Sequence, residues 1–190
     1  ESAESAEKTA TPDPLAPLSA TDWDTRVGEG RGVWVHVAEQ RLYVIEKHAV
    51  VWSAPCATAE KGTGNLAGTD QTPLGWHQIT DKLGEGAPWG QVFRSRQATH
   101  EVWNPRANHT EDLVLSRVLL LDGMEPGVNK GKNAAGQVVD SRARYVYIHG
   151  TNAEEKIGTP SSHGCIRMTN DDVIAAFEQI PAGTLMLISE

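Results

Sequence analysis

Short runs of alternating apolar and polar residues dominate the chain after residue 31 and restrict it to β structure. Three such runs follow closely on one another: VWVHVA at 33–38, RLYVIE at 41–46 and AVVWSAPC at 49–56. In the first run the three valines stand at alternate positions. They therefore share one face, because successive side chains of a strand point to opposite sides. Runs this short with tight connections predict a β-meander.

The remainder of the chain continues in the same way, with one exception. LVLSRVLLL at 113–121 fits a strand or a helix, and its β-branched residues favour a strand. NDDVIAAFEQI at 170–180 is the clear helix, because Asn170 can cap it and its apolar residues recur at helical spacing. The other predicted strands are 73–79, 91–96, 144–150 and 184–188. The sequence therefore predicts a mostly β domain with one short helix.

The strand predicted at 144–150, RYVYIHG, carries a histidine near its end. Alternation places Tyr145, Tyr147 and His149 on one face and the aliphatic Val146 and Ile148 on the other. Because the aliphatic face should enter the core, we expect His149 on the opposite face.

Residues 1–30 differ in composition from the rest of the chain. They contain seven acidic and two basic residues, which accounts for five of the eight net negative charges, and they are rich in Ala, Ser, Thr and Pro. Such a segment buries too little apolar surface to offset its ordering entropy, so a disordered acidic linker is expected there. Residues 31–190 are expected to form one folded domain. Within it, the segment 80–143 is a loop-rich insertion and a possible lid.

Composition also excludes several classes of function. The acidic chain shows no basic stripe of the kind a nucleic-acid partner requires. No apolar run approaches the ~20 residues of a membrane span. The absence of an initial Met and the linker-like start favour export to the periplasm or cell envelope with a leader removed. A trimmed cytoplasmic enzyme is the alternative, and a monomer is expected in either case.

The two cysteines, Cys56 and Cys165, are too few for a disulfide scaffold. A single bridge between them is possible in an oxidising compartment, but free thiols are favoured. Cys56 ends an apolar strand, so it is expected to be buried and inert.

Three interpretations compete for Cys165, which lies in YIHGTNAEEKIGTPSSHGCIRMTN at 147–170. His149, His163 and Cys165 are ligand types that zinc accepts, although a structural zinc site usually has four ligands. Alternatively, Cys165 is a small buried hydrophobe. Its neighbours Ser161, Ser162 and Gly164 form a core poorly, however, and favour an exposed turn. The third interpretation is a nucleophile.

A nucleophilic cysteine needs a base and donors for the oxyanion that develops during attack. His149 can deprotonate Cys165 while the Gly150 carbonyl orients the ring. The backbone N–H groups of His163, Gly164 and Cys165 can form the oxyanion hole. Arg167 can present its guanidinium to a carboxylate. The reaction class is acyl transfer through a thioester, which needs no cofactor and no metal.

Several segments resemble one known family. IHGT at 148–151 followed by SHGCIRM at 162–168 is similar to the catalytic motif of the YkuD-type L,D-transpeptidases. QTPLGWHQI at 71–79 resembles that family's TPxGxF-like strand, with His77 at the aromatic position. PCATA at 55–59 resembles a further family segment. The resemblance covers roughly residues 31–190, and the SHGC motif carries most of its specificity.

This resemblance implies a fold, a site and a substrate. The implied fold is a β-sandwich of mixed sheets with one short helix after the nucleophile loop. Cys165 matches the nucleophile and His149 the base, with Gly150 as its orienter. His163 and Gly164 match residues that shape the oxyanion hole. Arg167 matches a substrate contact, and the further candidates for substrate contact are Ser162, Tyr147 and Arg117. For Arg117, a structural salt bridge is the competing interpretation, since it interrupts an apolar run.

The implied substrate is the peptidoglycan stem tetrapeptide or a muropeptide. The thiolate would attack the carbonyl at the L-centre of the third residue, a diamino acid, and expel D-Ala. An amine from a second stem would then give a 3–3 crosslink, whereas water would give a tripeptide, which is L,D-carboxypeptidase activity. A catalytically inactive cell-wall binding module is the alternative from another class.

Overall fold

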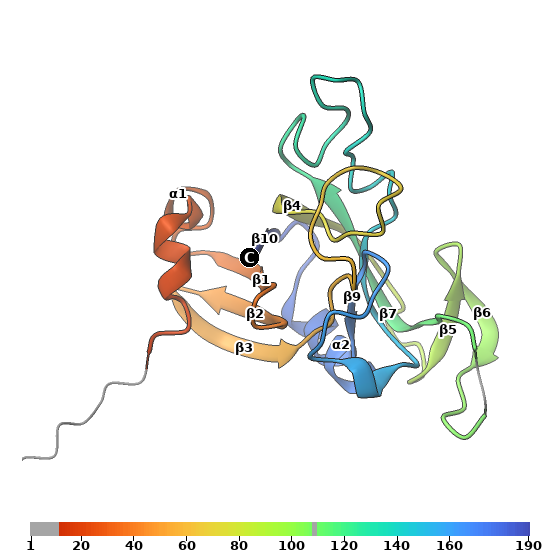
Figure 1. Cartoon of the computed structure of the whole chain (residues 1–190). Helices are drawn as coiled ribbons and strands as arrows, with labels where there is room; N and C mark the ends of the chain where they lie inside the picture. The colour runs from red at the N-terminus through yellow and green to blue at the C-terminus, as the bar shows by residue number, and fades with distance from the viewer. Residues whose placement is uncertain (1–11, 108–109) are drawn as a thin grey trace, which may run out of the picture.

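Ten strands form one mixed sheet in the computed structural model, which describes residues 12–107 and 110–190 (Figure 1). The predicted meander is present as β1 (Arg31–His36), β2 (Arg41–Glu46) and β3 (Ala49–Pro55). The later strands are β4 (Gly75–Leu83), β5 (Gln91–Arg94), β6 (Gln97–Val102), β7 (Val114–Gly123), β8 (Tyr147–Gly150), β9 (Ile166–Met168) and β10 (Leu185–Ser189). The prediction of a mostly β fold with mixed pairing is confirmed.

The sheet curls round its core, so one continuous sheet supplies both sides of the sandwich. Its main path is β3-β2-β1-β10-β4-β7-β5-β6, and β8 branches from β7 to pair with β9. The β1–β10 and β8–β9 pairs are parallel, and the other strand pairs are antiparallel. A bridge between Ala57, just after β3, and Arg167 in β9 brings distant parts of the sheet together. Apolar side chains from β1, β2, β4, β7, β8, β9 and β10 meet in this core.

The segment 80–143 contributes more to the sheet than a loop-rich insertion would. β7, whose residues 115–121 are all buried, pairs with β4, β5 and β8. It is a strand, as its β-branched residues favour, and it belongs to the framework of the domain. β5 and β6 form a hairpin at the edge of the sheet, and the long loop after β7 protrudes from the body (Figure 1).

The predicted helix is present as α2 (Asn170–Gln179), with Val173 and Phe177 buried in the core. Its cap differs from the prediction. Thr169 is the N-cap residue and its side chain accepts a hydrogen bond from the N–H of Asp172. Asn170 is instead fully buried and donates to the Thr151 carbonyl, 3.0 Å away. Its side chain therefore ties the start of α2 to the chain just beyond β8.

The prediction of a disordered linker over 1–30 is wrong for residues 12–30. A 3-10 helix, η1 (Ala16–Ala20), and a short helix, α1 (Trp23–Arg26), lie against the sheet. Trp23 is buried with its ring centroid 5.7 Å from that of Trp76, and the indole N–H of Trp76 donates to Asp22. Burial of these large apolar groups offsets the ordering entropy of the segment. Residues 1–11 of the predicted linker lie outside the described residues.

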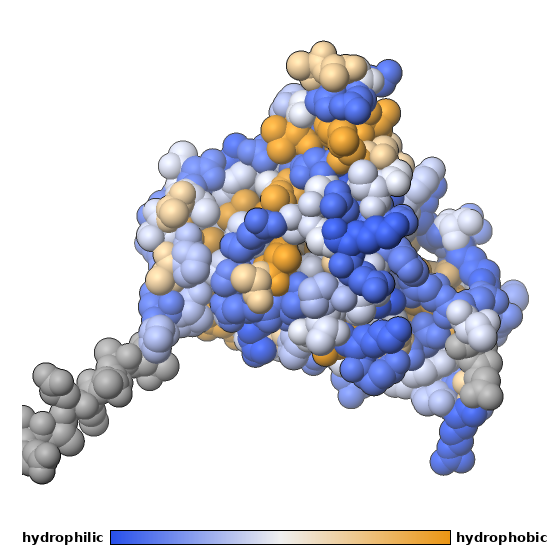
Figure 2. All heavy atoms as spheres, viewed as in Figure 1, coloured by the Kyte–Doolittle hydropathy of each residue, from blue (hydrophilic) through white to orange (hydrophobic). Residues whose placement is uncertain are grey.

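The face shown in Figure 2 is mostly hydrophilic, and apolar residues gather in patches near the top of the view and lower on the body. Leu66, Val128 and Val138 are exposed apolar residues, and the Ala67 N–H donates to the Val138 carbonyl, which links the loop between β3 and β4 to the loop after β7. Within the described residues, no helix is both long and apolar enough to cross a membrane.

His77 makes folding stability dependent on pH. Its ring is fully buried, with Nδ1 3.0 Å from the Gly75 carbonyl and Nε2 2.8 Å from Ser141 Oγ. Burial lowers its pKa from 6.5 to about 4. The unfolded chain therefore takes up this proton first as the pH falls, and stability present above pH 6.5 is lost down to about pH 4. The loss attributable to His77 is about 3 kcal/mol.

Urea unfolding at pH 7 and pH 4 checks this linkage. His77→Gln should be less stable than the parent at pH 7 and should lose less stability on acidification. His100→Gln, which changes an exposed histidine, is the matched control and should retain the parent's pH dependence. An unchanged acid sensitivity in His77→Gln would contradict the assignment.

Candidate active site

Cys165 lies directly before β9, where the sheet turns its sulfur toward a surface pocket. The parallel register pairs Ile148 with Ile166, so Cys165 stands beside Tyr147. The Tyr147 N–H donates to Sγ at 3.3 Å, and the thiol donates to the Tyr145 carbonyl at 3.4 Å. The half-buried thiol lines a cavity of about 250 Å³. It is therefore accessible and held by backbone groups on two sides.

The turn that presents Cys165 depends on glycine. Gly164 has φ +128°, and a Cβ there would lie 3.3 Å from the Gln71 carbonyl oxygen. Its own carbonyl accepts a hydrogen bond from Thr72 Oγ1 at 3.0 Å. Any other residue would be strained in this backbone conformation. The TPLG segment, from a distant part of the chain, thus packs against the turn that precedes Cys165 and stabilises it.

Ser162 fastens this turn internally, which corrects two predictions. Its hydroxyl donates to the Cys165 carbonyl at 2.6 Å and accepts the Gly164 N–H at 3.2 Å. Ser162 is buried and does not line the Cys165 pocket, so it is not placed for substrate contact. The Gly164 N–H is also occupied. Within residues 12–107 and 110–190, the backbone N–H groups of His163 and Cys165 donate no hydrogen bond, so they are the donors left for an oxyanion.

His149 lies in β8, with its ring held as the sequence suggested. Nδ1 is 2.7 Å from the Gly150 carbonyl oxygen, so Nδ1 carries the hydrogen and Nε2 keeps the lone pair. The side chain is buried, although the sequence placed it on the face opposite the core. His149 and Arg167 occupy paired positions, and Cys165 stands two residues before Arg167. Alternation therefore places the side chains of His149 and Cys165 on the same face of the β8–β9 pair.

Burial favours the uncharged forms of both Cys165 and His149. The pKa of the Cys165 thiol is raised to about 11, chiefly because the surrounding protein atoms reduce the contact of the sulfur with water. The Tyr147 N–H and the charges of Arg167 and Arg144 partly offset this rise, whereas Asp112 adds to it. The pKa of His149 is lowered, again chiefly by burial. Nucleophilic attack thus requires the proton to move from sulfur to a base.

Arg167, predicted to contact substrate, is held inside the protein. It is buried, it pairs with Asp112 Oδ1 at 3.1 Å, and it donates to the Ser161 carbonyl at 2.6 Å. The exposed His163 side chain lies 3.3 Å from the other Asp112 oxygen. Asp112, which lies in the segment before β7, thus contacts residues on both sides of Cys165, namely His163 and Arg167. Through these contacts Arg167 stabilises the turn that precedes Cys165.

The structure does not bring Arg117 to the site. Its guanidinium donates to the carbonyls of Ala87 and Ser116 and lies 5.5 Å from the Phe177 ring centroid. It lines no pocket with Cys165, and within the described residues it makes no salt bridge, so neither interpretation of Arg117 holds. Cys56 is a free, fully buried thiol, as predicted, and burial raises its pKa to about 12.

The side chains proposed for zinc do not gather. His163 turns outward to Asp112, while His149 is buried beside Gly150. In the part of the chain that the structure describes, no group of three or more His, Cys, Asp or Glu residues could hold a metal ion.

Several residues at the site escaped sequence reasoning. Arg144 lines the Cys165 pocket and donates to the Gln71 carbonyl at 2.6 Å. Tyr145, placed in a strand by its sequence, instead has φ +57° outside β8 and exposes its ring. Thr72 and Asp112 contact residues next to Cys165 but lie far from them in the sequence. The sequence offered a signal only for Arg144, which is the basic residue at the start of the segment RYVYIHG that contains His149.

Comparison with known proteins agrees with this geometry. A family model described as the YkuD L,D-transpeptidase catalytic domain matches residues 30–188. The "Probable L,D-transpeptidase YbiS" of Escherichia coli K12 is 32% identical over 154 residues, covering 80% of this chain and 42% of that protein. The "Probable L,D-transpeptidase ErfK/SrfK" of Salmonella typhimurium is 29% identical over 158 residues, covering 83% and 43%. The chain thus spans less than half the length of these relatives.

Solved structures show a similar fold. L,D-transpeptidase 3 from Mycobacterium tuberculosis, in complex with a faropenem-derived adduct, matches with a TM-score of 0.50 and 13% identity. The match covers 85% of this chain and 61% of that chain. At this identity the likeness concerns the fold alone.

Proposed function

Since the chain belongs to the YkuD L,D-transpeptidase catalytic-domain family, we propose that it is a cysteine acyltransferase acting on peptidoglycan stem tetrapeptides. The observation that supports this best is the constellation round Cys165. An accessible thiol lies on the same face as an imidazole whose Nδ1 is fixed by the Gly150 carbonyl. Nucleophilic acyl transfer pairs a thiol with such a base within hydrogen-bond reach, so catalysis requires the thiol to turn from the Tyr145 carbonyl toward His149.

Acylation begins with proton transfer from the Cys165 thiol to Nε2 of His149. Because the Gly150 carbonyl accepts from Nδ1, it favours the imidazolium that forms. The thiolate attacks the carbonyl at the L-centre of the diamino acid, and the oxyanion accepts hydrogen bonds from the N–H groups of His163 and Cys165. Collapse of the tetrahedral intermediate breaks the peptide bond, and His149 returns the proton to the departing D-Ala amine.

Resolution of the thioester repeats these roles. His149 takes a proton from the incoming amine, which attacks the thioester carbonyl, and the sulfur leaves as thiol once the proton is returned. The product is a 3–3 crosslink. Attack by water in place of the amine gives the tripeptide. We expect this chemistry in the periplasm or cell envelope, where the stem peptides lie.

Incubation with a disaccharide-tetrapeptide, followed by mass spectrometry, tests the proposal. Crosslinked dimers with free D-Ala are the expected products. Tripeptide with free D-Ala would assign the carboxypeptidase reaction to the same thioester. Unchanged substrate, under conditions where Cys165 reacts with a carbapenem, would refute the peptide substrate while leaving the nucleophile in place.

A further inference from the structure

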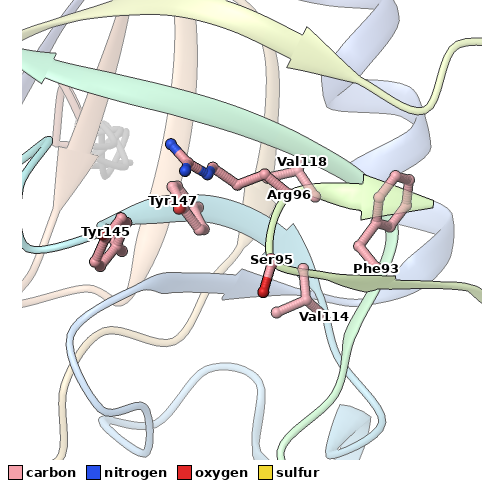
Figure 3. A pocket seen from close by; sticks show the side chains of 7 residues that line it. All are labelled: Phe93, Ser95, Arg96, Val114, Val118, Tyr145 and Tyr147. Atoms are coloured by element: carbon pink, nitrogen blue, oxygen red, sulfur yellow. The ribbon is translucent and has the colours of Figure 1, made fainter. Parts of the chain in front are cut away.

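A second pocket lies beside the β5–β6 hairpin and is lined in part by Tyr145 and Tyr147 (Figure 3). Its volume is about 430 Å³, and apolar side chains from β5 and β7 form its body. Tyr145 lines both this pocket and the Cys165 pocket, and its carbonyl accepts the Cys165 thiol hydrogen bond. The two cavities are therefore neighbours that share Tyr145.

Arg96 is the one charged residue among the described residues that line this second pocket. Figure 3 shows its side chain reaching from the hairpin toward the two tyrosines, and its guanidinium carbon lies 5.5 Å from the Tyr145 ring centroid. Its charge also partly lowers the pKa of Tyr147, which burial raises. The cation is thus held over an aromatic ring at the edge of an apolar cavity.

Among the described residues this guanidinium lacks an acidic partner, as do those of Arg41, Arg106, Arg117 and Arg144, so its charge is not neutralised within the chain. Within residues 12–107 and 110–190, no carboxylate lies within salt-bridge distance of Arg96. Arg94, two residues earlier on the same hairpin, contacts both Glu101 and Glu111. The arginines that do form salt bridges with carboxylates are Arg26, Arg31, Arg94, Arg142 and Arg167.

The backbone at Arg96 is unfavourable for an arginine. Ser95 and Arg96 form the two-residue connection between paired Arg94 and Gln97, and both have positive φ, 50° and 62°. These angles define a type I′ turn, in which Asn and Gly are strongly preferred. Arg96 therefore places a long cationic side chain at a turn position where Asn or Gly would stabilise the hairpin. The Lys47–His48 turn between β2 and β3 has the same pair of positive φ angles, so what distinguishes Arg96 is the cavity that it lines.

We propose that Arg96 is a specificity residue that binds a carboxylate of the peptide substrate in the cavity beside the β5–β6 hairpin. This inference rests on the proposed function, since it takes the stem peptide as the ligand. The stem offers two sources of the same chemistry, the C-terminal carboxylate of the leaving D-Ala and a side-chain carboxylate nearer the acylated residue. The apolar body of the cavity accommodates the adjoining aliphatic groups.

Binding measured without turnover tests the inference independently of catalysis. In a Cys165→Ala background, calorimetric titration compares the disaccharide-tetrapeptide with its C-terminal amide and with a side-chain amidated form. Arg96→Asn should raise the Kd of the unmodified peptide about tenfold, the effect of losing one charge-assisted hydrogen bond. Amidating the carboxylate that Arg96 binds should weaken binding similarly, and Arg96→Asn should then have no additional effect. Arg96→Lys should retain part of the affinity.

Stability separates this role from a structural one. Arg96→Asn should melt at the same temperature as the parent or about 2 °C higher, because it relieves the turn. Arg94→Gln, the matched control on the same hairpin, should leave peptide affinity unchanged. Equal affinity in Arg96→Asn and the parent, or Arg96 effects that persist with both amidated peptides, would overturn the inference. Absence of turnover by the parent protein, with peptide binding intact in the Cys165→Ala background, would instead count against the proposed function alone.

Discussion

Cys165→Ala is expected to abolish turnover of the tetrapeptide, with a loss on the order of 10⁶-fold, as for other nucleophiles that act with a partner base. No other described thiol can replace it, because Cys56 is fully buried with its pKa raised to about 12. The variant should fold normally, since the Cys165 side chain is half-buried at a pocket. Product analysis measures the loss directly.

Intact-mass analysis with a carbapenem provides the control for Cys165. The parent should gain one adduct and Cys165→Ala none, whereas Cys56→Ala should react like the parent. An adduct that persists in Cys165→Ala would show that another group is the nucleophile.

His149→Gln should lower turnover at neutral pH by about 10² to 10⁴-fold, the usual contribution of a general base. Glutamine is preferred to alanine because His149 is buried and truncation would leave a cavity. Without the base, reaction depends on thiolate formed by solvent. Since the pKa of Cys165 is raised to about 11, the thiolate fraction should rise roughly tenfold per pH unit below that value.

The pH dependence of the rate therefore distinguishes a base from a packing residue. Between pH 7 and 10, the rate of His149→Gln should climb steadily, while the parent's rate should climb far less. Iodoacetamide labelling of Cys165 in both proteins reports thiol access independently of the peptide. A uniform loss at every pH in His149→Gln would indicate misfolding and argue against the base.

Local sequence patterns predicted the parts of this fold that depend on neighbours in the chain. The meander was located almost to the residue, with β2 spanning Arg41–Glu46, because strand alternation is set by adjacent side chains. The contact between His149 and the Gly150 carbonyl was predictable for the same reason. The helix was located, but its cap was assigned to Asn170 although Thr169 fills that position.

Predictions that depended on distant contacts failed. Residues 12–30 were expected to be disordered, but Trp23 packs against Trp76. Arg117 was a candidate for substrate contact or for a structural salt bridge, but it lies against Phe177. A pattern within one segment carries no information about what packs on it from elsewhere. One local prediction also failed, because the Gly164 N–H was expected to be free and Ser162, two residues earlier, accepts its hydrogen bond.

The sequence by itself determined that this chain is mostly β, and it pointed to Cys165, His149 and the glycine-containing turn as the proposed site, because strand alternation and turn chemistry are local. Only the tertiary structure decided which groups surround that motif. Asp112, Thr72 and Arg144 reach the Cys165 turn, and Arg96 reaches the cavity beside it, from segments well separated in the chain. The curling sheet brings these segments together, since burying the apolar residues of both its sides in one core fixes where each polar group lies.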